Sequence, residues 1–135
     1  FPGYIDFVSN EWNATAFLPE SCDDCVTPEG HLTGYHKYQL AEDANLRMGF
    51  MSTKQDSVIA DTFLGIGGDA FEAALLPAMA ELEEAYPERF KSLIADGNSH
   101  TFIQAQFTRE VGGTVVSQWI DTMLTGSADW VSVSD

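Results

Sequence analysis

Two residues that could act together as an acid–base pair, Asp56 and His100, each follow a short apolar segment of the chain, at 48–52 and 92–95. An imidazole serves as a general base when a carboxylate bonds one ring nitrogen and turns the other toward a nucleophile. The pattern therefore predicts that Asp56 orients His100, and that His100 activates a hydroxyl for attack on a carbonyl carbon.

A serine that could complete this triad is not recognisable in the chain. The Gly-x-Ser-x-Gly sequence, which exposes a nucleophilic serine at a strand-to-helix turn, does not occur. Ser52, Ser57, Ser99 and Ser117 all lack such a context. We therefore expect the nucleophile to come from a segment outside this chain, and we expect the isolated chain to be inactive.

Other residues compete with this interpretation. Asp96 lies closer to His100 in the sequence and is an alternative partner for the imidazole, whereas Asp61 falls inside a predicted helix. Asp56 could also cap that helix, and one carboxylate oxygen could do so while the other meets the imidazole. His100 could be an ordinary surface or capping residue.

The elements that must position this pair are strands alternating with helices. Such alternation favours an α/β fold with a parallel sheet covered on both faces. Two strands are too few to form that sheet, so the remaining strands should come from another chain, an N-terminal half or self-association. The expected elements are a strand over 48–52, a short helix over 56–64, a glycine turn over 65–68, a helix over 69–86, a strand over 92–95, a helix over 107–124 and a polar-apolar tail over 128–135.

The two longer helices have apolar residues at helical spacing. For the helix over 69–86, Asp69 and Glu72 match a capping box at its start. Its predicted buried face is Phe71, Leu75, Ala78, Leu82 and Ala85, and its predicted solvent-facing carboxylates are Glu81, Glu83, Glu84 and Glu88. The helix over 107–124 should bury Val111, Val115, Trp119 and Met123 and end at Gly126.

The first 40 residues read as an irregular cap or connecting segment, and 41–135 read as the α/β part. The segment is rich in aromatic and turn-forming residues, with one helical turn expected from Tyr38. A connection of this length usually covers a neighbouring element, so Trp12 and Tyr35 are candidates to line a substrate pocket. The chain begins at Phe1 without an initiator Met, which suggests a trimmed product or a part of a longer protein.

The composition limits the classes of partner. A formal net charge of −15 over 135 residues repels nucleic acid and anionic lipid, and suits a salty or extracellular medium. No apolar run approaches the ~20 residues that cross a bilayer. We therefore expect no nucleic-acid or membrane partner and an extracellular or periplasmic location.

The two cysteines, Cys22 and Cys25, are separated by two aspartates. A local disulfide outside the cytosol is the favoured reading. The cysteines could also be half of a zinc site, but the sequence has no second pair of ligands at suitable spacing. A redox-active pair is disfavoured because the two aspartates oppose thiolate formation. His31 and His36 show no metal-ligand pattern and are expected at the surface, so no metal or cofactor is predicted. Asn13 begins a glycosylation sequon whose use is left open.

Several segments together resemble the C-terminal half of the pectin acetylesterase family. They are Asn45 to Asp56 with its Ser-x-x-Gln-Asp, Phe63, the 69–86 helix, Tyr86-Pro87, Ser92 to Thr101 with its Asp-Gly-x-x-His-Thr, and Trp119. The resemblance implies the C-terminal portion of a three-layer α/β-hydrolase fold, with Asp56 and His100 as the triad acid and base. It also implies a serine esterase acting on esters such as acetylated carbohydrates, with the serine, its elbow and the oxyanion loop upstream.

A different class of function is compatible with the same sequence. The chain could be a non-catalytic structural or binding subunit, in which Asp56 caps a helix and His100 lies at the surface. A thiol-redox module using Cys22 and Cys25 is a third reading.

Overall fold

The computed structural model describes residues 13–26, 33–102 and 106–135. Contacts divide the chain into two compact units, Phe1–Leu46 and Arg47–Asp135, and each is described by itself. The division falls six residues beyond the expected end of the N-terminal segment at 40.

The N-terminal unit contains more helix than the sequence predicted. A 3-10 helix, η1, spans Ala14–Phe17, and α2 spans Thr33–Glu42, where only one helical turn was expected. The loop before α2 contains the Cys22–Cys25 disulfide, which confirms that the two cysteines form a local disulfide. The Tyr35 N–H donates to the Cys25 carbonyl at 3.1 Å, so the start of α2 is bonded to the disulfide loop.

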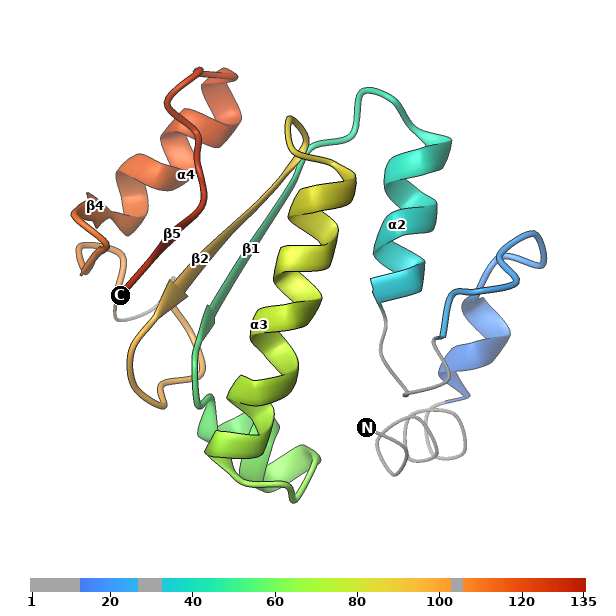
Figure 1. Cartoon of the computed structure of the whole chain (residues 1–135), viewed down its shortest axis with the longest axis horizontal. Helices are drawn as coiled ribbons and strands as arrows, with labels where there is room; N and C mark the ends of the chain where they lie inside the picture. Colours follow the sequence, from blue (N-terminus) through green and yellow to red (C-terminus); the bar gives the residue numbers. More distant parts are fainter. Residues whose placement is uncertain (1–12, 27–32, 103–105) are drawn as a thin grey trace. The chain divides into compact units, whose positions relative to one another are not determined.

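The C-terminal unit is built on a parallel sheet. Its strands are β1 (Met48–Thr53), β2 (Phe90–Ala95) and β5 (Val133–Ser134), in the order β1-β2-β5 (Figure 1). The parallel pairing of the two predicted strands is confirmed, in a register that aligns Met48 with Phe90 and Thr53 with Ala95. The third strand was not predicted, because a two-residue strand has no measurable periodicity and forms only through its long-range pairing with β2.

One face of the sheet is covered by α3 (Gly68–Ala85), which follows a π-helix, η2 (Val58–Phe63). Side chains of β2 alternate between the two faces, so Ser92 and Ile94 lie on the α3 side, where they line a groove with α3 residues. Five residues of α3 are buried: Phe71, Leu75, Ala78, Met79 and Leu82. The predicted face is therefore correct except at Ala85, which is exposed.

Two predictions about polar residues of α3 were wrong. The helix begins at Gly68, and its N-cap is Gly67, with no side-chain cap. The Asp69 carboxylate accepts a hydrogen bond from Gln55 Nε2 at 2.9 Å instead of closing a capping box. Glu83 is half-buried, because its Oε1 accepts hydrogen bonds from the hydroxyls of Ser92 and Ser132 on β2 and beside β5.

The opposite face is covered by α4 (Val116–Thr125). The predicted helix over 107–124 was wrong in its first half, where β3 (Glu110–Val111) and β4 (Thr114–Val115) form an antiparallel hairpin. Gly112 and Gly113, both with positive φ, make its two-residue turn. Gly126 ends α4 in the left-handed conformation, as predicted.

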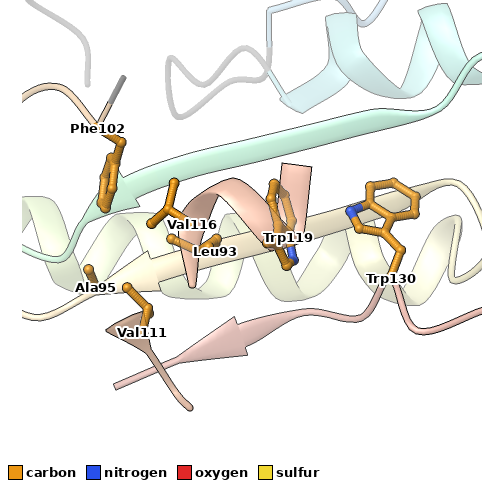
Figure 2. Close-up of a cluster of buried hydrophobic side chains, with 7 residues drawn as sticks. All are labelled: Leu93, Ala95, Phe102, Val111, Val116, Trp119 and Trp130. Atoms are coloured by element: carbon orange, nitrogen blue, oxygen red, sulfur yellow. The ribbon is translucent and has the colours of Figure 1, made fainter. Parts of the chain in front are cut away.

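The main core lies between α4 and β2. Figure 2 shows this cluster extending along β2, with Phe102, Ala95 and Val111 toward one end and the two tryptophans toward the other. Trp119 Nε1 donates to the Val131 carbonyl at 2.7 Å, so the indole is buried without an unsatisfied N–H. The buried cluster consists of Leu93, Ala95, Phe102, Val111, Val116, Trp119 and Trp130.

A glycine in β1 allows α4 to approach the sheet. A Cβ added at Gly49 would lie 2.8 Å from Met123 Sδ and 3.0 Å from Trp119 Cη2. We expect Gly49→Ala to lower the free energy of unfolding by about 1–3 kcal/mol through overpacking, as measured by urea denaturation. Met123→Ala in the Gly49→Ala background should recover part of this loss, and strict additivity of the two changes would contradict the assigned contact.

Candidate active site

The candidate site lies in two loops at the carboxyl ends of β1 and β2. Asp56 belongs to the loop after β1, and His100 belongs to the loop after β2. The carboxyl ends of neighbouring parallel strands meet at one rim of a sheet, which is where α/β proteins usually place their ligand sites. The parallel register of β1 and β2 therefore delivers both residues to the same rim.

The structure brings the carboxylate and the imidazole into direct contact. His100 Nδ1 lies 2.9 Å from Asp56 Oδ2 and 3.1 Å from Oδ1. Asp56 is buried, with 3% of its surface exposed, whereas 41% of the His100 side chain is exposed. The pair thus consists of an enclosed acid and a ring that remains accessible to a second reactant.

The chemistry of the two groups fixes the proton position on the neutral ring. An ionised carboxylate can only accept hydrogen bonds, so Nδ1 must carry the proton that is shared with Asp56. Nε2 of His100 is then the nitrogen with a free lone pair. This is the arrangement in which an imidazole can accept a proton from a nucleophile.

Asp56 also caps the helix that follows it. Its Oδ1 accepts hydrogen bonds from the backbone N–H groups of Val58 at 3.1 Å and Ile59 at 3.0 Å. These donors and the imidazole N–H together satisfy a carboxylate that would be costly to bury alone. The capping role and the pairing role therefore coexist in one side chain.

Hydrogen bonds continue between the two loops beyond the last paired strand residues. The Gln55 N–H donates to Gly97 O at 3.0 Å, and the Ser57 N–H donates to Asn98 O at 3.0 Å. The Thr53 hydroxyl donates to Ser99 O at 2.7 Å. Because these bonds flank Asp56 on one loop and precede His100 on the other, they set the separation of the two side chains.

Asp96, the rival acid, is engaged elsewhere. Its carboxylate is 66% exposed and forms an ion pair with Lys54 Nζ. Asp61 is exposed on η2. Of the three carboxylates considered in the sequence, Asp56 is the one that the structure places against His100.

The remaining candidates lie in the N-terminal unit or outside the described residues. Tyr35 is in α2, while Trp12 and His31 fall outside the described residues, so the pocket role of Trp12 and Tyr35 stays a prediction. His36 is half-buried, which corrects its expected surface position, and burial lowers the pKa of its imidazole. In the C-terminal unit, the glycine turn predicted at 65–68 is present with positive φ at Gly65 and Gly67, except that Gly68 is already the first residue of α3.

Two serines near the candidate site have hydroxyls that donate to backbone carbonyls and not to His100. The Ser52 hydroxyl donates to its neighbouring carbonyl at Thr53, and the Ser57 hydroxyl donates to Asn98 O. Within ranges 13–26, 33–102 and 106–135, none of the hydrogen bonds of the imidazole is to a serine hydroxyl.

A groove of about 200 Å³ lies apart from the pair, between α3 and the β2–β5 edge of the sheet.

A carboxylate that is removed from a buried position leaves its donors unsatisfied. Asp56→Ala would leave the N–H groups of Val58 and Ile59 without this acceptor, and we expect it to lower the free energy of unfolding by about 1–3 kcal/mol. Asp56→Asn keeps an acceptor for these groups and should cost less. Equal denaturation midpoints for wild type and Asp56→Ala would contradict the capping role.

Fold and site together define a mixed α/β protein, with a parallel three-stranded sheet flanked by helices and a carboxylate–imidazole pair at the carboxyl end of that sheet. Comparison with models of protein families, with curated proteins and with solved structures gives no match to the chain.

Proposed function

We propose that this chain is the C-terminal part of a serine carboxylic ester hydrolase, to which it supplies the acid Asp56 and the base His100. The observation that supports this most directly is the 2.9 Å contact between Asp56 Oδ2 and His100 Nδ1 at the carboxyl ends of two adjacent parallel strands. The proposed fold is the C-terminal portion of an α/β-hydrolase, as the resemblance to pectin acetylesterases implies.

The proposed mechanism begins with a serine from the complementary part. Its Oγ attacks the ester carbonyl carbon while its proton passes to His100 Nε2, and the carbonyl π electrons move onto oxygen. Collapse of the tetrahedral intermediate breaks the bond to the alcohol, which takes the proton from the imidazolium. Water then hydrolyses the acyl-serine by the same steps, with His100 again as base. Asp56 stabilises the imidazolium throughout.

The free edge of β1 is the proposed attachment site for the complementary part. Among the described residues β1 is an edge strand, and its residues 48–51 are partly exposed, whereas most of β2 is buried. Parallel strands are normally covered and paired on both sides. A strand of another chain, or of an N-terminal half, would extend the sheet here and bring the serine to the same rim.

The proposed substrate is an ester, and acetylated carbohydrate is the class that the resemblance implies. An extracellular or periplasmic location is supported by the Cys22–Cys25 disulfide and by the acidic composition. No helix within the described ranges is both long enough and apolar enough to span a membrane.

A fluorophosphonate probe tests the proposal, because it phosphonylates serines that an imidazole activates. We expect the assembled protein to be labelled on one serine, located by mass spectrometry in the complementary part and not in this chain. Labelling should disappear in His100→Ala. An adduct on a serine of this chain, or unchanged labelling in His100→Ala, would overturn the assignment of roles.

The second candidate is a non-catalytic structural or binding subunit, which the lack of a serine bonded to His100 among the described residues favours. Sedimentation of the isolated chain separates the two candidates. A stand-alone binding module should be a monomer that unfolds cooperatively, while half of a hydrolase should self-associate or require its complement, because β1 leaves an open edge.

A further inference from the structure

A group of charged and polar residues lies where β1, β2 and β5 end, and we call it the Asp135 network. Its members are Lys54, Asp96, Arg109, Gly112 and Asp135. Oδ1 of Asp135 accepts the Gly112 N–H at 3.0 Å, and Oδ2 accepts the Asp96 N–H at 3.0 Å and lies 3.4 Å from Arg109 Nη2. One carboxylate thus connects the hairpin turn, the end of β2 and a guanidinium.

The network holds Asp96 at each of its polar groups. Its N–H donates to Asp135, its carbonyl accepts from Arg109 Nη2 at 2.7 Å, and its carboxylate accepts from Lys54 Nζ. Lys54 Nζ also donates to the Asp135 carbonyl at 2.7 Å. The backbone of Asp96 is therefore fixed between partners on other segments.

Both loops of the candidate site begin in this network. Lys54 is the first residue after β1, two positions before Asp56, and Asp96 is the first residue after β2, four positions before His100. The segment 96–100 is exposed throughout and includes Gly97 at φ 104°, and beyond Asp96 the carbonyls of Gly97, Asn98 and Ser99 accept hydrogen bonds from residues 53–57. Asp96 is the point at which this loop leaves β2, and Asp135 and Arg109 bond its backbone there.

We infer that Asp135 is a positioning residue of the site: by fixing Asp96, it directs the 96–100 loop so that the His100 imidazole stays on Asp56. The importance of this role for catalysis rests on the proposed function, whereas the hydrogen bonds that support the role do not. The ionised state of Asp135 is supported by the hydrogen bonds from Gly112 and Asp96 and by Arg109, which lower the pKa of its carboxyl group.

Nitrogen-15 NMR of the imidazole in the full chain tests the inference at a pH where the ring is neutral. The measured quantity is the ratio of ring protonated at Nδ1 to ring protonated at Nε2, because contact with Asp56 favours Nδ1. We expect Asp135→Ala to lower this ratio about tenfold, as the loss of charge-assisted hydrogen bonds allows the loop to move. Asp135→Asn, which keeps one acceptor oxygen, should give a smaller decrease.

Asp129→Ala is the matched control, since it removes an exposed carboxylate of the same unit that accepts a hydrogen bond from the neighbouring Ser127 hydroxyl. It should leave the ratio unchanged. If Asp135→Ala prevents folding, Arg109→Gln, which removes the bond to the Asp96 carbonyl, should lower the ratio in its place.

An unchanged ratio in a folded Asp135→Ala or Arg109→Gln variant would overturn the positioning role, even if its denaturation midpoint falls. That result would leave the hydrolase proposal intact, because the Asp56–His100 contact would persist. Conversely, the assembled protein could lack esterase activity while Asp135→Ala lowers the Nδ1-to-Nε2 ratio as expected. That result would contradict the proposed function and support the positioning role.

Discussion

His100→Ala should reduce the turnover number of the assembled protein for p-nitrophenyl acetate by about 10⁴–10⁶, with a much smaller change in KM. The imidazole is the proposed base for both acylation and deacylation, so its loss slows each step. Its contribution arises from the contact of Nδ1 with Asp56, which leaves Nε2 to take the proton of the serine.

A double variant makes this prediction sharper. Members of a triad act as a unit, so Asp56→Asn combined with His100→Ala should lose little more activity than His100→Ala alone. Asp61→Ala, which removes an exposed carboxylate of η2, serves as the control and should retain activity. Full activity in His100→Ala, or additive losses in the double variant, would contradict the triad assignment.

Trp119→Ala should lower the free energy of unfolding by about 3–5 kcal/mol, which is a large part of the stability of a typical domain. Trp119 is 2% exposed at the centre of the α4–sheet core, and its ring centroid lies 6.0 Å from that of Trp130. Truncation would leave a cavity and would remove the indole N–H that now donates to the Val131 carbonyl.

Guanidinium denaturation of the full chain, followed by circular dichroism, measures this loss. Trp119→Phe is the graded control, because it keeps most of the apolar volume and removes the hydrogen bond. It should cost less than Trp119→Ala. A loss below about 1 kcal/mol in Trp119→Ala would mean that α4 does not pack on β2 as described.

The strands and the pair at their ends could be predicted because their signals are local. Short apolar runs stop at polar loops, and parallel neighbours bring their carboxyl ends together, so the order acid-then-histidine was sufficient to place Asp56 and His100 at one rim. The sequence predicted Asp56 as the partner and left Asp96 as the alternative; the structure decides between them, because His100 Nδ1 contacts Asp56 while Lys54 pairs with the Asp96 carboxylate.

The hairpin was missed although its signal is present. A spacing of four residues, which fits a helix, separates Val111, Val115, Trp119 and Met123. The helix was predicted from this spacing, although the Gly112-Gly113 pair lies within it. A two-residue glycine turn between β-branched residues is a strong hairpin signal, and positive φ at both glycines explains why the helix cannot extend through them.

Other features depend on contacts between segments far apart in the sequence. β5 forms only by pairing with β2, and Glu83 turns from solvent toward the sheet because Ser92 and Ser132 meet there. Asp135 reaches Asp96 across 39 residues. No period or motif within one segment encodes such contacts.

The position of the proton on the neutral His100 ring tests the central claim most directly. Nitrogen-15 NMR of the folded wild-type chain should show this proton on Nδ1. Asp56→Asn should shift it toward Nε2, because an amide oxygen that still accepts from Val58 and Ile59 leaves the NH₂ group to donate to Nδ1. A wild-type ring protonated mainly at Nε2, and unchanged in Asp56→Asn, would mean that Asp56 does not orient the imidazole and would remove the basis for a triad.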